Sequence, residues 1–269
     1  VKKGLNPSKN RNDGAREAKG EIIAFLDDDA FVDKDLFVKT EKFFDKHDVD
    51  VVGGPQLTPE SDKFFAKTSG FVIGSFFGSF TMSNRYKKGK ESLDADETYI
   101  TSANCFIKRN SFMKTEGFNT KLFPGEDPEF FTRIKKQGLK IAYSPELIIY
   151  HKRRHNFKGF LRQVYLYGRS RLLKSKLNNE KPGVVFFMPA VFSMLVIPLV
   201  LLGIFVHYGF YFPVILYFLI NIICSLYIGF REGIHRFPLL VALFFVWHFS
   251  YGIGMVSYLL KNESYEICF

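Results

Sequence analysis

The sequence predicts an α/β domain followed by three membrane-spanning helices, and the distribution of apolar and charged residues carries this prediction. Short apolar runs alternate with helical patterns over residues 1–150, which is typical of a sheet covered by helices. From Gly183 onward the chain is almost entirely apolar and its few charges cancel, so the whole net charge of +10 lies in residues 1–182. A basic domain beside an apolar tail indicates an anionic membrane surface or a phosphate-bearing substrate, whereas the sequence shows no nucleic-acid-binding motif.

The elements of residues 1–150 follow from apolar runs, helix caps and glycines. Asn12 or Asp13 is expected to cap a short first helix that ends at Gly20, and Gly138 is expected to end the last helix of this region. The other predicted elements are, in chain order, the strand 21–26, the helix 35–46, the strands 49–53 and 98–108, the helix 128–136, and the strands 140–143 and 147–150.

Two segments leave alternatives open. Residues 64–80 hold six Phe among Gly and Ser, which suits either a membrane-interface segment or an ordinary buried one. Residues 157–177 place Phe160, Val164 and Tyr167 near helical spacing among many cations. This second pattern predicts an interfacial helix that leads into the first membrane span.

The tail contains three uncharged runs, each meeting the roughly 20 residues that a bilayer core requires. Three such runs in succession make buried helices of a soluble protein the weaker alternative. Lys and Arg precede the first run and occur in the second link but not in the first, which predicts a cytoplasmic domain and an external C-terminus. The expected division is a domain of residues 1–156, a basic interfacial helix of 157–182, and a membrane domain of 183–269 with spans at about 183–206, 208–228 and 238–260.

Cysteine usage favours a reducing compartment. Cys105, Cys224 and Cys268 are far apart in the sequence. They form neither a disulfide framework nor a zinc-binding motif.

The stretch EIIAFLDDDA places three carboxylates directly after an apolar run. In open α/β sheets, ligands gather beyond the carboxyl ends of strands. Residues i and i+2 of an extended chain point the same way, so Asp27 and Asp29 are expected to converge on one cation. Their oxygens suit Mg²⁺ or Mn²⁺, and substrate phosphates commonly complete such a site. The alternative is a solvated acidic turn or a helix cap.

The stretch PGEDPEFFTRIKKQG contains a second acidic pair, Glu126 and Asp127. Asp127 before Pro128 is a good helix N-cap, which is the purely structural interpretation. A carboxylate at a helix start in a cleft can also accept a proton from a hydroxyl nucleophile. Both interpretations stay open at this point.

Two longer stretches, SKNRNDGAREAKGEIIAFLDDDA and TSANCFIKRNSFMKTEGFNTKLFPGEDPEFFTRIKKQGLKIAYSPELIIYH, together resemble a family 2 glycosyltransferase with a GT-A fold. The resemblance covers about residues 8–177, with the motifs in the family's order. The apolar tail resembles that of membrane-bound members that build cell-surface polysaccharides or glycolipids. Roughly two βα units that precede the Arg-Asn segment in the family are missing, so a GT-A domain lacking its first strands is expected.

The resemblance implies roles for the acidic residues. Asp27 and Asp29 match the DxD motif, in which Asp28 is the variable position. Asp29 would bind the divalent metal, Mn²⁺ or Mg²⁺, that bridges the nucleotide-sugar diphosphate, and Asp27 would contact ribose or metal. Asp127 matches the catalytic base that deprotonates the acceptor hydroxyl, and Glu126 would support it or contact the acceptor.

Further roles are implied outside the acidic motifs. Arg11 and Asn12 fall where the family places donor-contacting residues. His151 follows a predicted strand, where some members carry a further metal or diphosphate contact, although a His at a strand end is also a common structural residue.

One departure from the family concerns the segment before the membrane helices. Processive members carry a QxxRW motif there, whereas this chain has RQVYLYGRSR, with Gln163 but no Arg-Trp, which favours single sugar addition. Arg162, Gln163, Arg169 and Arg171 would meet a lipid-linked diphosphate acceptor or the leaving nucleotide. Contact with anionic lipid is the alternative for the arginines.

The resemblance therefore implies an inverting, metal-dependent glycosyltransferase in the plasma membrane, with its catalytic domain in the cytoplasm. It would move a sugar from a nucleotide-sugar donor to a lipid-linked or saccharide acceptor. One alternative is a polyprenyl-phosphate sugar synthase, whose phosphate acceptor is already ionised and needs no base. The other is a catalytically silent membrane scaffold, which the expected missing front part would explain.

Overall fold

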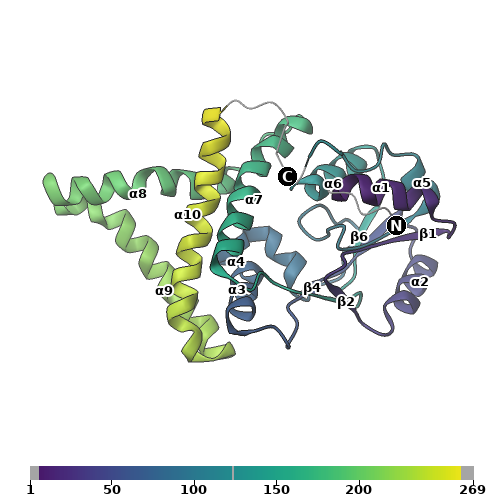
Figure 1. Cartoon of the computed structure of the whole chain (residues 1–269), viewed down its shortest axis with the longest axis horizontal. Helices are drawn as coiled ribbons and strands as arrows, with labels where there is room; N and C mark the ends of the chain where they lie inside the picture. The colour runs from purple at the N-terminus through teal and green to yellow at the C-terminus, as the bar shows by residue number, and fades with distance from the viewer. Residues whose placement is uncertain (1–5, 123, 262–269) are drawn as a thin grey trace.

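The computed structural model describes residues 6–122 and 124–261, which form an α/β part and an apolar helical tail (Figure 1). The strands are β1 Ile22–Leu26, β2 Ala30–Val32, β3 Val51–Gly53, β4 Gln56–Leu57, β5 Asn104–Lys108, β6 Ile141–Tyr143 and β7 Ile149–His151. The helices of the α/β part are α1 Pro7–Glu17, α2 Leu36–Lys46, α3 Phe64–Gly74, α4 Phe76–Ser79, η1 Phe80–Tyr86, α5 Arg109–Met113, α6 Glu126–Lys136 and α7 Phe157–Leu177.

The larger sheet has the strand order β1-β5-β3-β6 and is mainly antiparallel. β1 and β3 pair antiparallel with β5, and β6 pairs parallel with β3. Successive side chains of a strand point to opposite faces. Accordingly, Cys105 and Ile107 join the core cluster that includes residues of α1, α5 and α6, whereas Phe106 joins the cluster that includes residues of α2. The sheet is therefore buried on both faces.

The smaller sheet has the strand order β2-β7-β4. β2 begins immediately after the acidic segment and pairs antiparallel with β7, so that Ala30 lies opposite His151. This register fixes His151 beside the carboxylates that follow β1.

Most of the predicted elements are confirmed, some with shorter bounds. Of the predicted strand 98–108, only Asn104–Lys108 is extended. The predicted start of the first helix is wrong, because Asn6 caps it and accepts a hydrogen bond from the backbone N–H of Lys9 at 3.0 Å. Pro7 suits the first helical position, since its missing N–H is not needed there. Asn12 consequently lies inside α1.

The two segments with open alternatives both pack against the tail. Residues 64–80 form α3, α4 and the start of η1, and α7 spans Phe157–Leu177 as predicted. Val72 of α3 and Phe160 of α7 are buried in one cluster with Trp247. One face of the segment 64–80 is thus buried in this fold, while Phe64 and Phe76 are exposed, so the membrane-interface interpretation stays a prediction.

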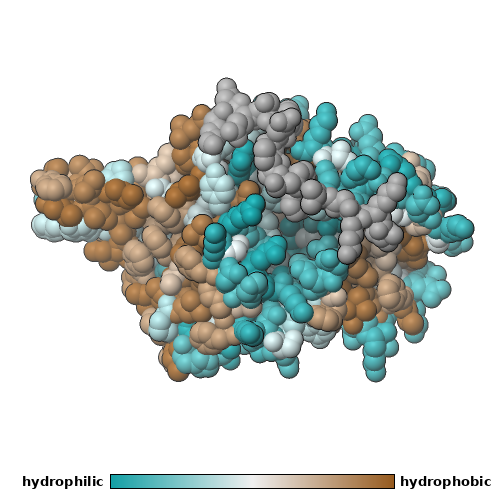
Figure 2. Space-filling view, in the orientation of Figure 1, coloured by the Kyte–Doolittle hydropathy of each residue, from teal (hydrophilic) through white to brown (hydrophobic). Residues whose placement is uncertain are grey.

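The tail contains η2 Val184–Phe187, α8 Met188–Phe205, η3 Tyr208–Tyr211, α9 Phe212–Glu232, η4 Ile234–Arg236 and α10 Phe237–Lys261. Three segments are long and apolar enough to cross a membrane, namely Val184–Phe205, Tyr208–Glu232 and Ile234–Leu260. This confirms the three predicted apolar helices. Figure 2 shows hydrophobic residues gathered over the projecting α8 and α9, and hydrophilic ones over the α/β part.

Candidate active site

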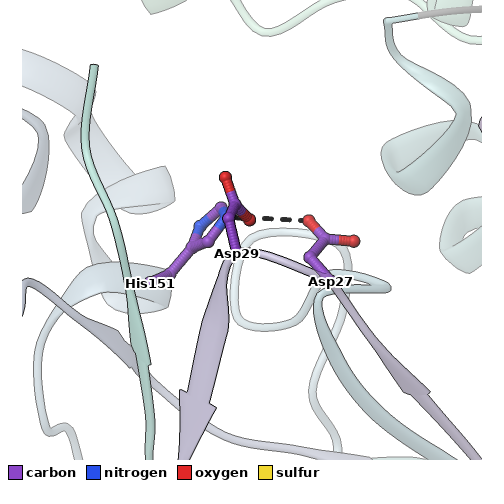
Figure 3. Close-up of side chains that lie close together, drawn as sticks. All are labelled: Asp27, Asp29 and His151. Carbon is purple, nitrogen blue, oxygen red and sulfur yellow. Dashed lines mark hydrogen bonds and ion pairs between the residues drawn. The ribbon is translucent and has the colours of Figure 1, made fainter. Parts of the chain in front are cut away.

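The three consecutive carboxylates after β1 form a turn. The backbone N–H of Ala30 donates to the carbonyl of Asp27 at 3.2 Å, and the segment is not extended. The alternation of an extended chain is therefore the wrong reason for expecting Asp27 and Asp29 to converge. They do converge, because the turn carries the chain from one sheet into the other (Figure 3). Asp28 is exposed.

His151 completes this group from β7. Its Nε2 lies 2.7 Å from Asp29 Oδ1 and 3.7 Å from Asp27 Oδ2 (Figure 3). The hydrogen bond to His151 lowers the pKa of Asp29 below its usual range, against the opposing effect of partial burial, so this carboxylate is ionised at neutral pH. The three side chains present one ligand atom each within 4.8 Å of one another.

These three residues fit a divalent cation. Two carboxylate oxygens suit Mg²⁺ and Mn²⁺, and an imidazole nitrogen is a softer ligand that favours a transition metal over Mg²⁺. His151 Nδ1 is buried and finds no hydrogen-bond partner within residues 6–122 and 124–261. Nε2 is therefore the nitrogen that faces the two carboxylates.

The second acidic pair begins α6. The N-cap of this helix is Gly125, with φ 115°, so the prediction that Asp127 caps the helix is wrong and Asp127 lies within its first turn. A Cβ on Gly125 would lie 2.8 Å from Cβ of Ser170, which means that α7 packs closely against this turn. Asp127 Oδ1 is buried and has no hydrogen-bond partner in the described part of the chain.

Arg11 joins the two acidic sites. Its Nη2 donates to Asp27 Oδ1 at 2.8 Å and its Nη1 donates to Glu126 Oε1 at 3.0 Å. The side chain of Arg11 is 17% exposed and that of Glu126 is 7% exposed, so the second ion pair is poorly screened by water. One guanidinium thus fixes the distance between two motifs that are far apart in the sequence.

Burial and charge shift the proton equilibria here. Burial and, to a smaller extent, the neighbouring Asp127 raise the pKa of Glu126 to about 7, against the opposing effect of Arg11. Burial also raises the pKa of Cys105, with a further contribution from Asp127, so this thiol stays neutral. Burial lowers the pKa of Arg11, but Asp127, Asp27 and Glu126 raise it by more. The guanidinium is permanently charged.

At pH 8, where Glu126 is ionised, replacing Arg11 with Met is expected to destabilise the protein by about 3 kcal/mol, because it leaves this buried carboxylate without its cation. Thermal unfolding in detergent measures this loss. The double variant R11M/E126Q should recover much of it, since the side chain at position 126 is then neutral and leaves no unpaired charge there. Lys9→Met on the same helix is the matched control, because its ion pair with Asp13 is exposed. Equal midpoints for R11M and K9M would contradict the bridging role.

The raised pKa of Glu126 predicts a stability that depends on pH. The folded protein holds this proton up to about pH 7, whereas the unfolded chain releases it near 4.5. The stabilisation is therefore complete below pH 4.5 and is lost as the pH rises to 7, by about 3 kcal/mol in total. Glu126→Gln should flatten this dependence in unfolding measurements between pH 5 and pH 8. Parallel pH profiles for the two proteins would argue against it.

Asn12 does not face the acidic cluster. Its Nδ2 donates to the carbonyl of Phe118 and its Oδ1 accepts from the N–H of Phe118, both at 2.8 Å. Gly117 has φ 73°, and a Cβ there would lie 2.5 Å from Asn12 Oδ1. Asn12 thus holds the Gly117–Phe118 turn under α6. Both polar atoms of its amide are thus engaged by Phe118, and the predicted donor contact stays a prediction.

The predicted residues of α7 are divided between two environments. Arg162 is exposed and Gln163 is half-buried near the start of the helix. Arg171 lies over the ring of Phe186 and donates to Tyr251 Oη at 3.3 Å, so it faces the tail. Arg169 is half-buried.

Two arginines near the site were not expected from the sequence. Arg153 lies over the ring of Tyr86, and its Nε donates to Thr58 Oγ1 at 3.1 Å. Arg85 is 7% exposed and donates to the carbonyl of Glu97, while its Nε is buried without a partner in the described residues. Neither guanidinium forms an ion pair within residues 6–122 and 124–261. The signal for Arg153 was the cationic run KRRH directly after β7.

A mixed α/β sheet with a carboxylate–histidine cluster beside a second acidic pair defines a glycosyltransferase-like domain. The model of glycosyl transferase family group 2 matches residues 22–256, and the chain belongs to this family. The family assignment made from the motifs is thereby confirmed. No sequence among curated proteins matches the chain.

Two solved structures are similar to this chain, and one of them is similar enough to support the fold. The mannosyltransferase PcManGT from Pyrobaculum calidifontis, in complex with GDP-Man and Mn²⁺, is similar over 97% of this chain and 68% of its own, with a TM-score of 0.56 and 12% identity. At this identity the similarity shows a common GT-A fold. TarS 1–349 from S. aureus, in complex with UDP-GlcNAc, has a TM-score of 0.43 at 14% identity, over 97% of this chain and 74% of its own, which is too low to support any argument.

Proposed function

We propose that this chain is a metal-dependent, inverting glycosyltransferase that moves a sugar from a nucleotide-sugar donor to a lipid-linked or saccharide acceptor. The observation that carries the proposal is the bridge from Arg11 to both Asp27 and Glu126. A donor-binding motif and an acceptor-activating motif must share one site, and this bridge holds them together. The enzyme would act in cell-surface polysaccharide or glycolipid synthesis at the plasma membrane, with its catalytic domain in the cytoplasm.

Asp29, Asp27 and His151 Nε2 would hold the divalent cation. The complex of PcManGT with GDP-Man and Mn²⁺ supports both a nucleotide-sugar donor and Mn²⁺ here. When bound, the cation would stabilise the negative charge of the departing nucleoside diphosphate. The carboxylates would orient the donor through it, and Arg11 would keep Asp27 in place.

Asp127 would take the proton of the acceptor hydroxyl. As the acceptor oxygen attacks the anomeric carbon, the bond to the nucleoside diphosphate breaks and the proton passes to Asp127. One displacement of this kind inverts the anomeric configuration. The unpartnered Oδ1 of Asp127 supports this role, because no described residue competes for it. Glu126 would position Asp127 through the start of α6.

A polyprenyl-phosphate sugar synthase is the second candidate, and Arg153 and Arg85 favour it. Two guanidiniums without a carboxylate partner are suited to bind a phosphate. Tyr86 and Tyr167, which lie beside these arginines, pack on the cluster that includes Leu240 and Trp247 of α10. The phosphate of a membrane lipid would therefore bind to Arg153 and Arg85, next to the apolar helix α10.

Transfer assays test the proposal directly. The full chain in lipid nanodiscs would be incubated with Mn²⁺, a panel of labelled nucleotide sugars including GDP-mannose and UDP-GlcNAc, and either a total lipid extract or oligosaccharides. We expect a labelled product whose anomeric configuration is opposite to that of the donor. A retained configuration would exclude single displacement, and donor binding without any transfer would favour the silent scaffold.

A further inference from the structure

α10 is packed differently from the other two apolar helices. In the most apolar stretch of α10, 50% of the residues are buried within the protein, whereas only 17% are buried in the corresponding stretches of α8 and α9. From Leu243 to Tyr258, Ile253 is the only exposed residue. A helix that faces lipid along its length would show an exposed apolar stripe, as α8 and α9 do.

The α/β part lines one side of α10 from end to end. Directly before its first residue, Arg236 Nη1 of η4 donates to Thr68 Oγ1 of α3 at 2.8 Å. Further along, Phe244 is 5.0 Å, centroid to centroid, from Phe77 of α4. Near the other end, Ser257 Oγ is 2.7 Å from Tyr165 Oη of α7.

α7 packs along α10, and the two helices run parallel. Phe160 packs on Trp247 with ring centroids 5.7 Å apart, and Leu172 clusters with Met255. Gly168 lies so close to the carbonyl of Tyr251 that a Cβ would not fit between the helices. Figure 1 shows the two helices side by side.

The charge of α7 determines whether α10 can cross a membrane while the two helices are packed together. Its 21 residues extend about 31 Å, which is about the thickness of a bilayer core. The helix contains no acidic residue, and its cations are Lys158, Arg162, Arg169, Arg171, Lys174 and Lys176. If α10 crossed the membrane in this conformation, α7 would be carried into the hydrocarbon with these cations, which is highly unfavourable.

The opposite side of α10 is covered by the hairpin of α8 and α9. Ser193 Oγ of α8 donates to the carbonyl of Phe249 at 3.0 Å, and Asn221 Nδ2 of α9 donates to the carbonyl of Val241 at 3.1 Å. α10 therefore lies between the hairpin and the α/β part, while α8 and α9 lead away from it to the turn at Val206 (Figure 1).

We propose that only α8 and α9 cross the bilayer, and that α10 lies at the membrane surface as the platform on which the α/β part is mounted. The turn at Val206 is then on the far side of the membrane, and Leu260 is on the same side as the active site. The surface at the start of α7 faces anionic headgroups, with Phe157 and Leu161 exposed next to Lys158 and Arg162. Three crossings would instead put Leu260 on the far side.

Single-cysteine labelling tests this topology in sealed vesicles of both orientations. The parent is the full chain with Cys224→Ser and Cys268→Ser, in which the buried Cys105 is kept. A membrane-impermeant maleimide is applied to Leu260→Cys, to Val206→Cys and, as the marker of the catalytic side, to the exposed Lys88→Cys. We expect L260C to label from the same side as K88C, and V206C from the opposite side.

Other labelling patterns would overturn the proposal. Labelling of L260C from the V206C side would mean three crossings, and labelling of L260C only after detergent would place the end of α10 in the hydrocarbon. Labelling of V206C from the K88C side would mean that the hairpin does not cross. Should a cysteine variant fail to fold, alkaline phosphatase fused after Phe269 of the unmodified chain gives a second measurement. Alkaline phosphatase is active only outside the bacterial cytoplasm, so we expect this fusion to be inactive in a bacterial host. An active fusion would contradict the proposal.

Discussion

Replacing Asp127 with Asn is expected to reduce sugar transfer by about 10²–10⁴-fold while the donor affinity changes little. Asn has the same shape, so α6 still begins at the same turn, but it cannot take the proton of an acceptor hydroxyl. The measurement pairs a transfer assay with calorimetric titration of the donor in the presence of Mn²⁺. A loss of transfer with intact donor binding would assign the base.

The control for this variant is Asp45→Asn, an identical change at an exposed position of α2. It should leave both transfer and donor binding unchanged. If D127N keeps near-normal transfer to a lipid phosphate, the base assignment is wrong and the polyprenyl-phosphate alternative gains support. A phosphate acceptor is already ionised and needs no base.

Replacing Asp29 with Ala is expected to abolish the Mn²⁺-dependent part of donor binding. Asp29 is the carboxylate closest to His151, and its removal leaves one carboxylate and one imidazole to hold the cation. We expect at least about a 100-fold loss of Mn²⁺ affinity, the upper end of what the loss of an outer-shell partner costs. Electron paramagnetic resonance of Mn²⁺ titrated into the protein measures this without any need for turnover.

Asp28→Ala is the matched control for this experiment. Asp28 lies in the same turn, is exposed and is not part of the cluster formed by Asp27, Asp29 and His151. D28A should bind Mn²⁺ as the wild type does. Equal Mn²⁺ affinities for D29A and D28A would refute the metal site, because the effect would then be one of general acidity in the turn.

Much of the fold and part of the site could be predicted because their determinants are local. The apolar run that predicts β1 and the apolar residues that predict α6 can each be recognised within about ten residues. The cap of α1 was misplaced because Asn6 and Asn12 are both good caps, and only Pro7 distinguishes them. The interpretation of Asp127 as a cap rests on Pro128, which suits a helix start, whereas the structure places the cap two residues earlier, at Gly125 with its positive φ and the close packing of Ser170.

The sequence by itself determined the family motifs, the apolar tail and the carboxylates of the site, because each is a property of adjacent residues. The tertiary structure decided which of these residues meet. Arg11 reaches Glu126 across 115 positions and His151 reaches Asp29 across 122, and these contacts exist only in the assembled fold. The proposed position of α10 at the membrane surface also follows from a tertiary contact, the packing of α7 along it. Its composition resembles that of a span, but the charged helix packed along it sets where it can lie relative to the bilayer.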